Sequence, residues 1–119
     1  MHFKQVIPVL PSADIVRDTN WYVKYAGFEI IWNDEMYALL KRDDIVLHLQ
    51  WHADTDDDPL LGGSVIRIKV EDINHYIDEF VERGTVVREK LRMNTPWNTH
   101  EFGFYDLNKN AVFIMQSLS

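Results

Sequence analysis

The sequence predicts an α+β fold made of two βαβββ units in tandem, within a single domain covering residues 1–119. Three observations indicate this fold: short stretches recur in the same order in both halves, matching stretches carry the same helix or strand signals, and a polar segment separates the copies. The chain has 119 residues, the length of one ordinary domain, and 46% of them are hydrophobic, enough for one core.

The repeat consists of three pairs of similar stretches. They are "VIPVLPSADI" (6–15) with "VIRIKVEDIN" (65–74), "YVKYAGFEII" (22–31) with "FVERGTVV" (80–87), and "DDIVLHLQ" (43–50) with "KNAVFIMQ" (109–116). The spacing between partners varies while their order does not, so the halves differ mainly in loop length.

The first unit, residues 1–52, begins with a branched, apolar stretch at 6–9 that predicts a strand. Asp14 can cap a helix whose apolar positions follow helical spacing, and Gly27 is placed to end it in a left-handed conformation. Three strands are then expected at 28–32, 36–41 and 45–51, separated by polar turns.

The second unit, residues 63–119, repeats this order after a polar linker at 53–62 that contains Pro and Gly. We expect a strand at 65–70, a helix between Asp72 and Gly84, and strands at about 85–93, 100–105 and 111–116. Along the strand at 65–70 the side chains alternate, so Ile66, Ile68 and Val70 suit a helix-covered face. Val65, Arg67 and Lys69 then point to the other face.

Charge and composition exclude several classes of function. A net charge of -7 disfavours a nucleic acid partner, because phosphate would be repelled. No apolar run approaches 18 residues, so no membrane partner is expected, and the N-terminus lacks the features of a secretory signal. Without cysteine there is no disulfide and no thiolate metal site, and we expect a cytoplasmic protein.

The histidines and acidic residues show no metal-binding pattern. His48 and His52 are four apart, but on a strand that spacing separates them by about 13 Å. The acidic run at 54–58 lacks the Gly and the distal Glu of a calcium loop, and it is interpreted as a solvated linker.

Longer stretches resemble a known family. The paired βαβββ pattern resembles the vicinal oxygen chelate superfamily, which includes glyoxalase I, extradiol dioxygenases and bleomycin resistance proteins. The bleomycin resistance branch is most similar, through "VLPSADIVRDTNWYVKYAGFEIIW", "YALLKRDDIVLHL" and "PWNTHEFGFYDLNKN". The resemblance implies a glyoxalase/bleomycin-resistance-like fold, in which each unit curls its sheet around a cleft, and a homodimer with two clefts at its interface.

The resemblance also implies where a metal would bind in the superfamily's enzymes. Those places fall near Val6, Leu47, Val65 and Phe113, none of which offers a lone pair to a metal. A shift of one residue supplies only His48 or Gln5. We therefore expect no metal, no cofactor and no catalytic residue of the superfamily's kind.

The resemblance places stacking aromatic residues at Trp32, Tyr37 and Trp97, and Arg67, His100 and Phe113 complete the expected ligand-binding set. Flat rings can stack on a flat heteroaromatic ligand, each contact contributing roughly 0.5–1.5 kcal/mol. The alternative is that these rings belong to the core. Residue 67 is Arg in this chain, whereas some bleomycin binders carry Trp at the corresponding position. An arginine in the cleft would favour an anion or carboxylate over a cationic drug.

Two functions of different class follow. The first is a metal-free binding protein that sequesters a small molecule, such as a bleomycin-like antibiotic, in an aromatic cleft. The second is a metal-dependent enzyme of the glyoxalase or dioxygenase kind. A dimeric protein without a small ligand is a third option, because a fold alone decides none of these.

Overall fold

The computed structural model describes residues 1–60 and 63–119 and confirms the α+β class. Its elements are β1 (Val9–Ser12), α1 (Ile15–Ala26), β2 (Glu29–Asn33), β3 (Tyr37–Arg42), β4 (Ile45–Trp51), β5 (Val65–Val70), α2 (Asn74–Glu82), a 3-10 turn η1 (Arg88–Lys90), β6 (Thr99–Tyr105) and β7 (Ala111–Ser117). The end of the predicted linker, residues 61 and 62, lies outside the described residues.

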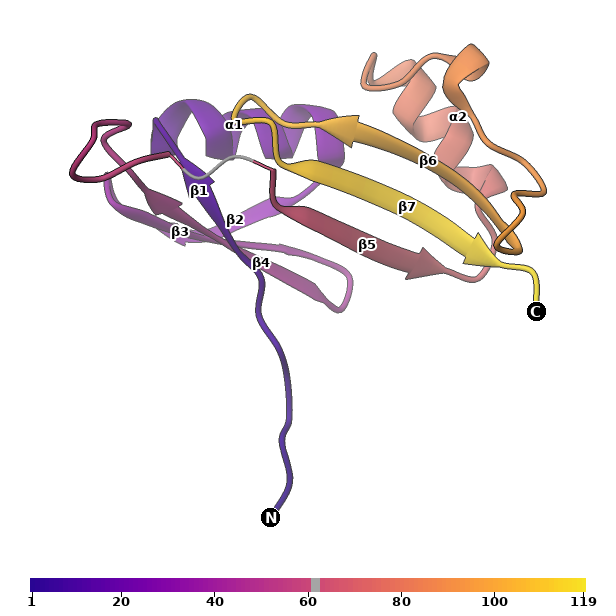
Figure 1. The fold of residues 1–119 in the computed structure, drawn as a ribbon, viewed down its shortest axis with the longest axis horizontal. Helices are drawn as coiled ribbons and strands as arrows, with labels where there is room; N and C mark the ends of the chain where they lie inside the picture. The colour runs from indigo at the N-terminus through magenta and orange to yellow at the C-terminus, as the bar shows by residue number, and fades with distance from the viewer. Residues whose placement is uncertain (61–62) are drawn as a thin grey trace.

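The strands form two sheets, one for each unit. The first has the order β1-β4-β3-β2 and the second the order β5-β7-β6; β1–β4 and β5–β7 are the parallel pairs. Both helices lie on the same side of the two sheets (Figure 1). We call the opposite side of each sheet, turned away from the helices, the open face.

The helix boundaries follow the local signals in the sequence. The Asp14 carboxylate accepts the backbone N–H of Arg17 at 3.1 Å, and Gly27 ends α1 with a φ of 73°. In the second unit Asp72 accepts the backbone N–H of Asn74 at 3.0 Å, and Gly84 follows α2 with a φ of 79°. In the described part of the chain no helix is long and apolar enough to cross a membrane.

The first strand lies three residues later than the sequence predicts. The expected range is 6–9, whereas β1 covers Val9–Ser12 and residues 1–8 project from the fold as an extended tail (Figure 1). The anchor of β1 is polar: Ser12 is buried and its hydroxyl donates to the Asp18 carboxylate. Pro11 is tolerated because β1 is an edge strand.

The predicted strand at 85–93 is wrong. That segment forms the turn η1 and keeps only an isolated bridge between Arg92 and Glu101, so the second sheet has three strands. Three consecutive charged residues, 88–90, fit a half-buried strand poorly. The chain turns there instead, with Lys90 N–H donating to the Val87 carbonyl at 3.0 Å.

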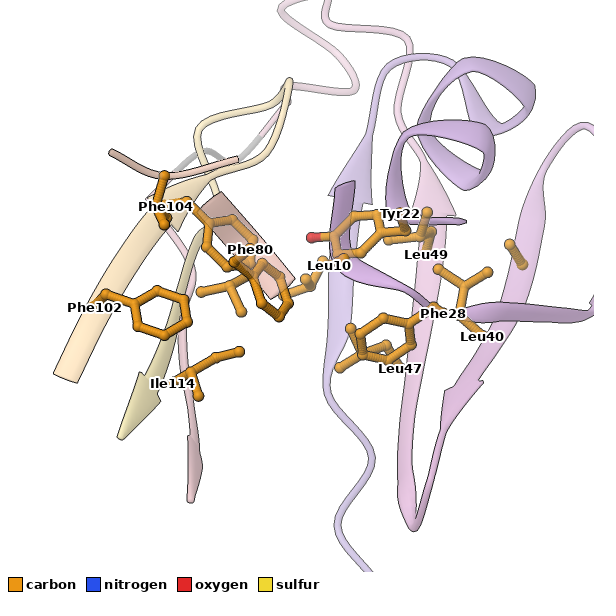
Figure 2. Packing of buried hydrophobic residues seen from close by; sticks show 14 of the residues in the cluster. Leu10, Tyr22, Phe28, Leu40, Leu47, Leu49, Phe80, Phe102, Phe104 and Ile114 are labelled. Carbon is orange, nitrogen blue, oxygen red and sulfur yellow. The ribbon is translucent and has the colours of Figure 1, made fainter. Parts of the chain in front are cut away.

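One apolar core draws on both units. Phe80 of α2 has ring-centroid distances of 5.5 Å to both Phe102 and Phe104 of β6. Figure 2 shows these rings beside the first unit's buried side chains, among them Leu10 and Tyr22. Burying aromatic rings is the largest apolar contribution available to a domain of this size.

A buried polar network also joins the units, at the β6–β7 turn. The Asn108 amide donates to Asp18 at 2.7 Å and its oxygen accepts the N–H of Ala13 at 3.1 Å. In the same region the Tyr22 hydroxyl donates to Asp106 at 2.7 Å. These contacts fix the start of α1 against the second sheet and therefore help to set the angle between the two open faces.

Candidate functional site

The register of the second sheet brings two of the predicted site residues, Arg67 and Phe113, onto one row of the open face together with Gly103. Arg67 of β5 lies opposite Phe113 of β7, and Phe113 lies opposite Gly103 of β6. Residues that face each other across neighbouring strands share a side of the sheet. The buried side chains Ile114 and Phe102 belong to the next row and point into the core, which leaves Arg67 and Phe113 on the open face.

The Phe113 ring lies directly over Gly103. A Cβ atom at residue 103 would come within 2.6 Å of two ring carbons, so only glycine allows this approach. On its other side the ring lies against the Arg67 guanidinium, whose central carbon is 5.2 Å from the ring centroid. The result is a layered arrangement of backbone, phenyl ring and guanidinium, and each layer is flat.

A buried carboxylate, Glu101, holds this arrangement in place. Its oxygen Oε1 accepts hydrogen bonds from Arg67 at 2.8 Å, from the Trp97 indole N–H at 2.7 Å and from the Thr99 hydroxyl at 2.6 Å. The Glu101 side chain is only 1% exposed, whereas 53% of Trp97 is exposed. One sealed anion therefore positions both the guanidinium and an indole ring that remains open to a ligand.

The electrostatics of this cluster follow from its hydrogen bonds. The bond from Arg67 is the main reason why the pKa of Glu101 falls to about 2, while burial opposes the fall and Thr99 and Trp97 reinforce it. Glu101 is therefore ionised at neutral pH, and its charge offsets that of Arg67. Arg67 consequently opposes a cationic ligand less than an unpaired arginine would.

The first unit contributes a second aromatic group on its own open face. Trp32 lies opposite Leu39, and Leu39 lies opposite His48, so the three share one face. Trp32 is half exposed. The Tyr37 hydroxyl and His48 Nδ1 are 2.7 Å apart, and the two rings meet edge to face with centroids 5.2 Å apart.

The predicted site residues thus fall into two groups and one outlier. Arg67, Trp97 and Phe113 come together in the second unit, while Trp32 and Tyr37 lie on the separate first sheet. His100 joins neither group.

His100 lies opposite Gln116, whose side chain accepts the N–H of Ile73 next to α2. That contact places the pair on the helix-covered side, where His100 Nδ1 accepts the N–H of Asn94 at 3.0 Å. His100 is therefore directed away from the open face that carries the other site residues.

Four positions correspond to metal ligands in the superfamily's enzymes, and the structure places only two of them, Val65 and Phe113, on the open face. Leu47 is fully buried in the core, so the residue of β4 that reaches the open face is His48. Val65 and Phe113 do reach the open face, but Val6 lies in the projecting tail. Within residues 1–60 and 63–119 no three His, Asp or Glu side chains gather in a way that could hold a metal ion.

Sequence reasoning missed Glu101 and Gly103; it weighed His48 as a metal ligand but did not predict its contact with Tyr37. The signal for the first two was the alternation in "HEFGFY", where buried Phe102 and Phe104 imply that Glu101 and Gly103 face the other way. That alternation gives the face of Glu101 but not its partners Arg67 and Trp97, which come from another strand and from a loop.

Comparisons with known proteins identify the family of the chain. The sequence profile of the Glyoxalase/Bleomycin resistance protein/Dioxygenase superfamily matches residues 4–113, and the chain belongs to that superfamily. The chain is 23% identical to a bleomycin resistance protein of Geobacillus stearothermophilus over 128 aligned positions, covering 96% of this chain and 97% of the relative.

Solved structures show the same fold. A bleomycin resistance determinant encoded on the transposon Tn5 is similar with a TM-score of 0.77 and 20% identity, covering 97% of this chain and 98% of that one. The bleomycin-binding protein of Streptomyces verticillus, complexed with copper(II)-bleomycin, is similar with a TM-score of 0.73 and 23% identity, covering 96% of each chain.

Proposed function

We propose that this protein binds and sequesters a small molecule with a flat ring system, with bleomycin-like antibiotics as the first candidates, and does not transform it. The observation that carries the proposal is the cluster in which Glu101 holds Trp97 and Arg67 beside Phe113. Relatives of similar length are bleomycin resistance and bleomycin-binding proteins, which supports the same class of ligand.

The cluster has the features that such binding needs. Trp97 is fixed by its indole N–H yet leaves about half of its surface free, so a ligand ring can stack on it at little entropic cost. Each aromatic stack contributes roughly 0.5–1.5 kcal/mol beyond the burial of area. Several such stacks, together with burial, bring micromolar binding within reach.

We further propose that the protein is a homodimer whose clefts combine the open faces of two chains. Within one chain the Trp32 group and the Trp97 group lie on different sheets, so a two-fold partner can place one against the other. The projecting tail supports this, because Phe3 and Val6 are almost fully exposed and a second copy would cover them. Sedimentation at micromolar concentration should give twice the 14.1 kDa chain mass; a monomer would contradict the dimer.

The alternative, a metal-dependent glyoxalase or dioxygenase, needs ligands at the open face. At or beside the four superfamily positions, His48 is the one such donor that the described residues place on the open face, and a single ligand does not make a metal site. We therefore propose that the protein works without a metal or cofactor, as a single cytoplasmic domain made of both units. Elemental analysis should find less than one Ni, Zn, Fe or Mn per chain; one tightly held ion per chain would favour the enzyme.

Tryptophan fluorescence tests the ligand site. Trp32 and Trp97 are half exposed, while Trp21 and Trp51 pack against the core, so bleomycin should quench a saturable part of the emission. Trp97→Ala should weaken binding by roughly 1–3 kcal/mol through lost stacking and burial. Met93→Ala, at an exposed residue nearby, is the matched control and should bind as the natural chain does. Equal binding by all three proteins would remove Trp97 from the site.

A further inference from the structure

A groove of about 340 Å³ crosses β6, from β7 to the segment at 90–92, next to the cluster formed by Glu101, Arg67 and Trp97. Its lining includes Gly103, Tyr105 and Phe113 on the open face and two cationic side chains, Lys90 and Arg92, at the free edge of the sheet. Arg92 lies opposite Glu101 across the isolated bridge, so its side chain shares the open face with Phe113. The groove is formed by one chain alone.

Within residues 1–60 and 63–119, the two cations of this groove have no carboxylate partner. Among the described residues, neither Lys90 nor Arg92 has a carboxylate oxygen within 4.0 Å, whereas nearby Arg88 pairs with Asp78 at 2.8 Å. The one carboxylate in the groove lining as described is Glu101, which is sealed and already accepts three hydrogen bonds. The charges of Lys90 and Arg92 are therefore available to a ligand.

Lys90 and Arg92 make the groove positively charged, although the chain as a whole carries a net charge of -7. At physiological salt, charges more than about 8 Å away are largely screened, so the local pair decides what binds in the groove. A guanidinium matches a carboxylate with two parallel hydrogen bonds, and a neighbouring ammonium adds a third donor.

The floor of the groove selects a flat molecule. The Phe113 ring is fixed between Gly103 and Arg67, and Tyr105 is 70% exposed at the next position along the open face. We propose that this groove binds an aromatic carboxylate, with its ring against Tyr105 and the edge of the Phe113 ring and its carboxylate held by Arg92 and Lys90. This subsite shares Phe113 with the site proposed for bleomycin-like ligands, but its cations, Lys90 and Arg92, belong to the groove alone and assign the chain a second class of ligand.

Three probes with one ring system test the proposal: 2-naphthoate, neutral 2-naphthamide and cationic 2-naphthylmethylamine, each titrated into the full chain by calorimetry or NMR. We expect naphthoate to bind about tenfold more tightly than the amide, and the amine to bind most weakly, as a charged hydrogen bond implies. Added salt should weaken naphthoate alone.

Variants locate the site. Arg92→Gln should remove the tenfold advantage of naphthoate over naphthamide without changing the amide, while Arg88→Gln, in the adjacent turn, should change neither. Both residues are exposed, and Arg92 makes its bridge through backbone atoms, so both variants should fold. Equal binding of acid and amide by the natural chain, or equal effects of the two substitutions, would overturn the proposal.

The naphthoate experiment tests the groove separately from the proposed binding of bleomycin. Naphthoate binding without bleomycin binding would leave this groove assigned and refute the drug as ligand, whereas bleomycin binding without a preference for the acid would refute the groove alone.

Discussion

Replacing Glu101 by Gln tests the buried carboxylate that organises the candidate site. The substitution keeps the size of the side chain but removes its charge, and it turns one of the two groups facing Arg67 into a donor. Trp97 and Thr99 can still donate to the remaining oxygen, so the loss is mainly that of the ionic contact.

The magnitude follows from the pKa of Glu101. A fall from the ordinary 4.5 to about 2 corresponds to about 3 kcal/mol of stabilisation by the ionised form. The Arg67 side chain is 40% exposed, and water screens part of this contact, so we expect Glu101→Gln to lower the free energy of unfolding by about 2 kcal/mol at pH 7.

The same pKa gives the sign of the pH dependence. Because the folded-state pKa lies below the unfolded value, the contribution of Glu101 is fully present above about pH 4.5 and is lost as the pH falls towards 2. The stability gap between the natural chain and Glu101→Gln should therefore close over this range. Other carboxylates with lowered pKa values, such as Glu79, are common to both proteins and cancel.

Urea unfolding at a series of pH values measures the gap, with Glu35→Gln, at an exposed glutamate, as the matched control that should show none. A gap that stays constant from pH 7 to pH 2, or a Glu101→Gln variant as stable as the natural chain, would show that the ionic contact does not stabilise the fold.

Two further substitutions test the packing that supports the open faces. Gly103→Ala should displace the Phe113 ring and destabilise the fold by about 1–3 kcal/mol, read as a change in near-ultraviolet circular dichroism together with lower urea resistance; an unchanged spectrum would contradict the close contact. Tyr22→Phe should cost about 1–3 kcal/mol in thermal unfolding, because the buried Asp106 carboxylate loses a donor; unaltered stability would mean that this buried bond contributes nothing.

Local signals in the sequence sufficed for much of the fold. Asp14 and Gly27 marked the ends of α1, and alternation along β5 separated Ile66 from Arg67 correctly. Each of these features depends on residues close together in the chain, which is why a single sequence reveals them.

The errors came from polar contacts and charges that the pattern of apolar residues does not show. The end of β1 is anchored by Ser12, which bonds to Asp18 in the next helix, and the branched residues at 6–9 do not indicate that bond. The segment at 85–93 has apolar residues at its start, but its charged centre forms a turn. Burial was similarly invisible for Glu101, because the pairing of β5 with β7, and of β7 with β6, brings Arg67 to it across 34 positions of the chain.

Calorimetric titration of bleomycin into the purified chain, followed by mass spectrometry of the recovered drug, tests sequestration most directly. Sequestration predicts saturable binding at one drug per chain, with the drug recovered unchanged after the protein is denatured. Absence of saturable binding would contradict the proposed ligand, and recovery of a chemically altered drug would show that the protein is an enzyme.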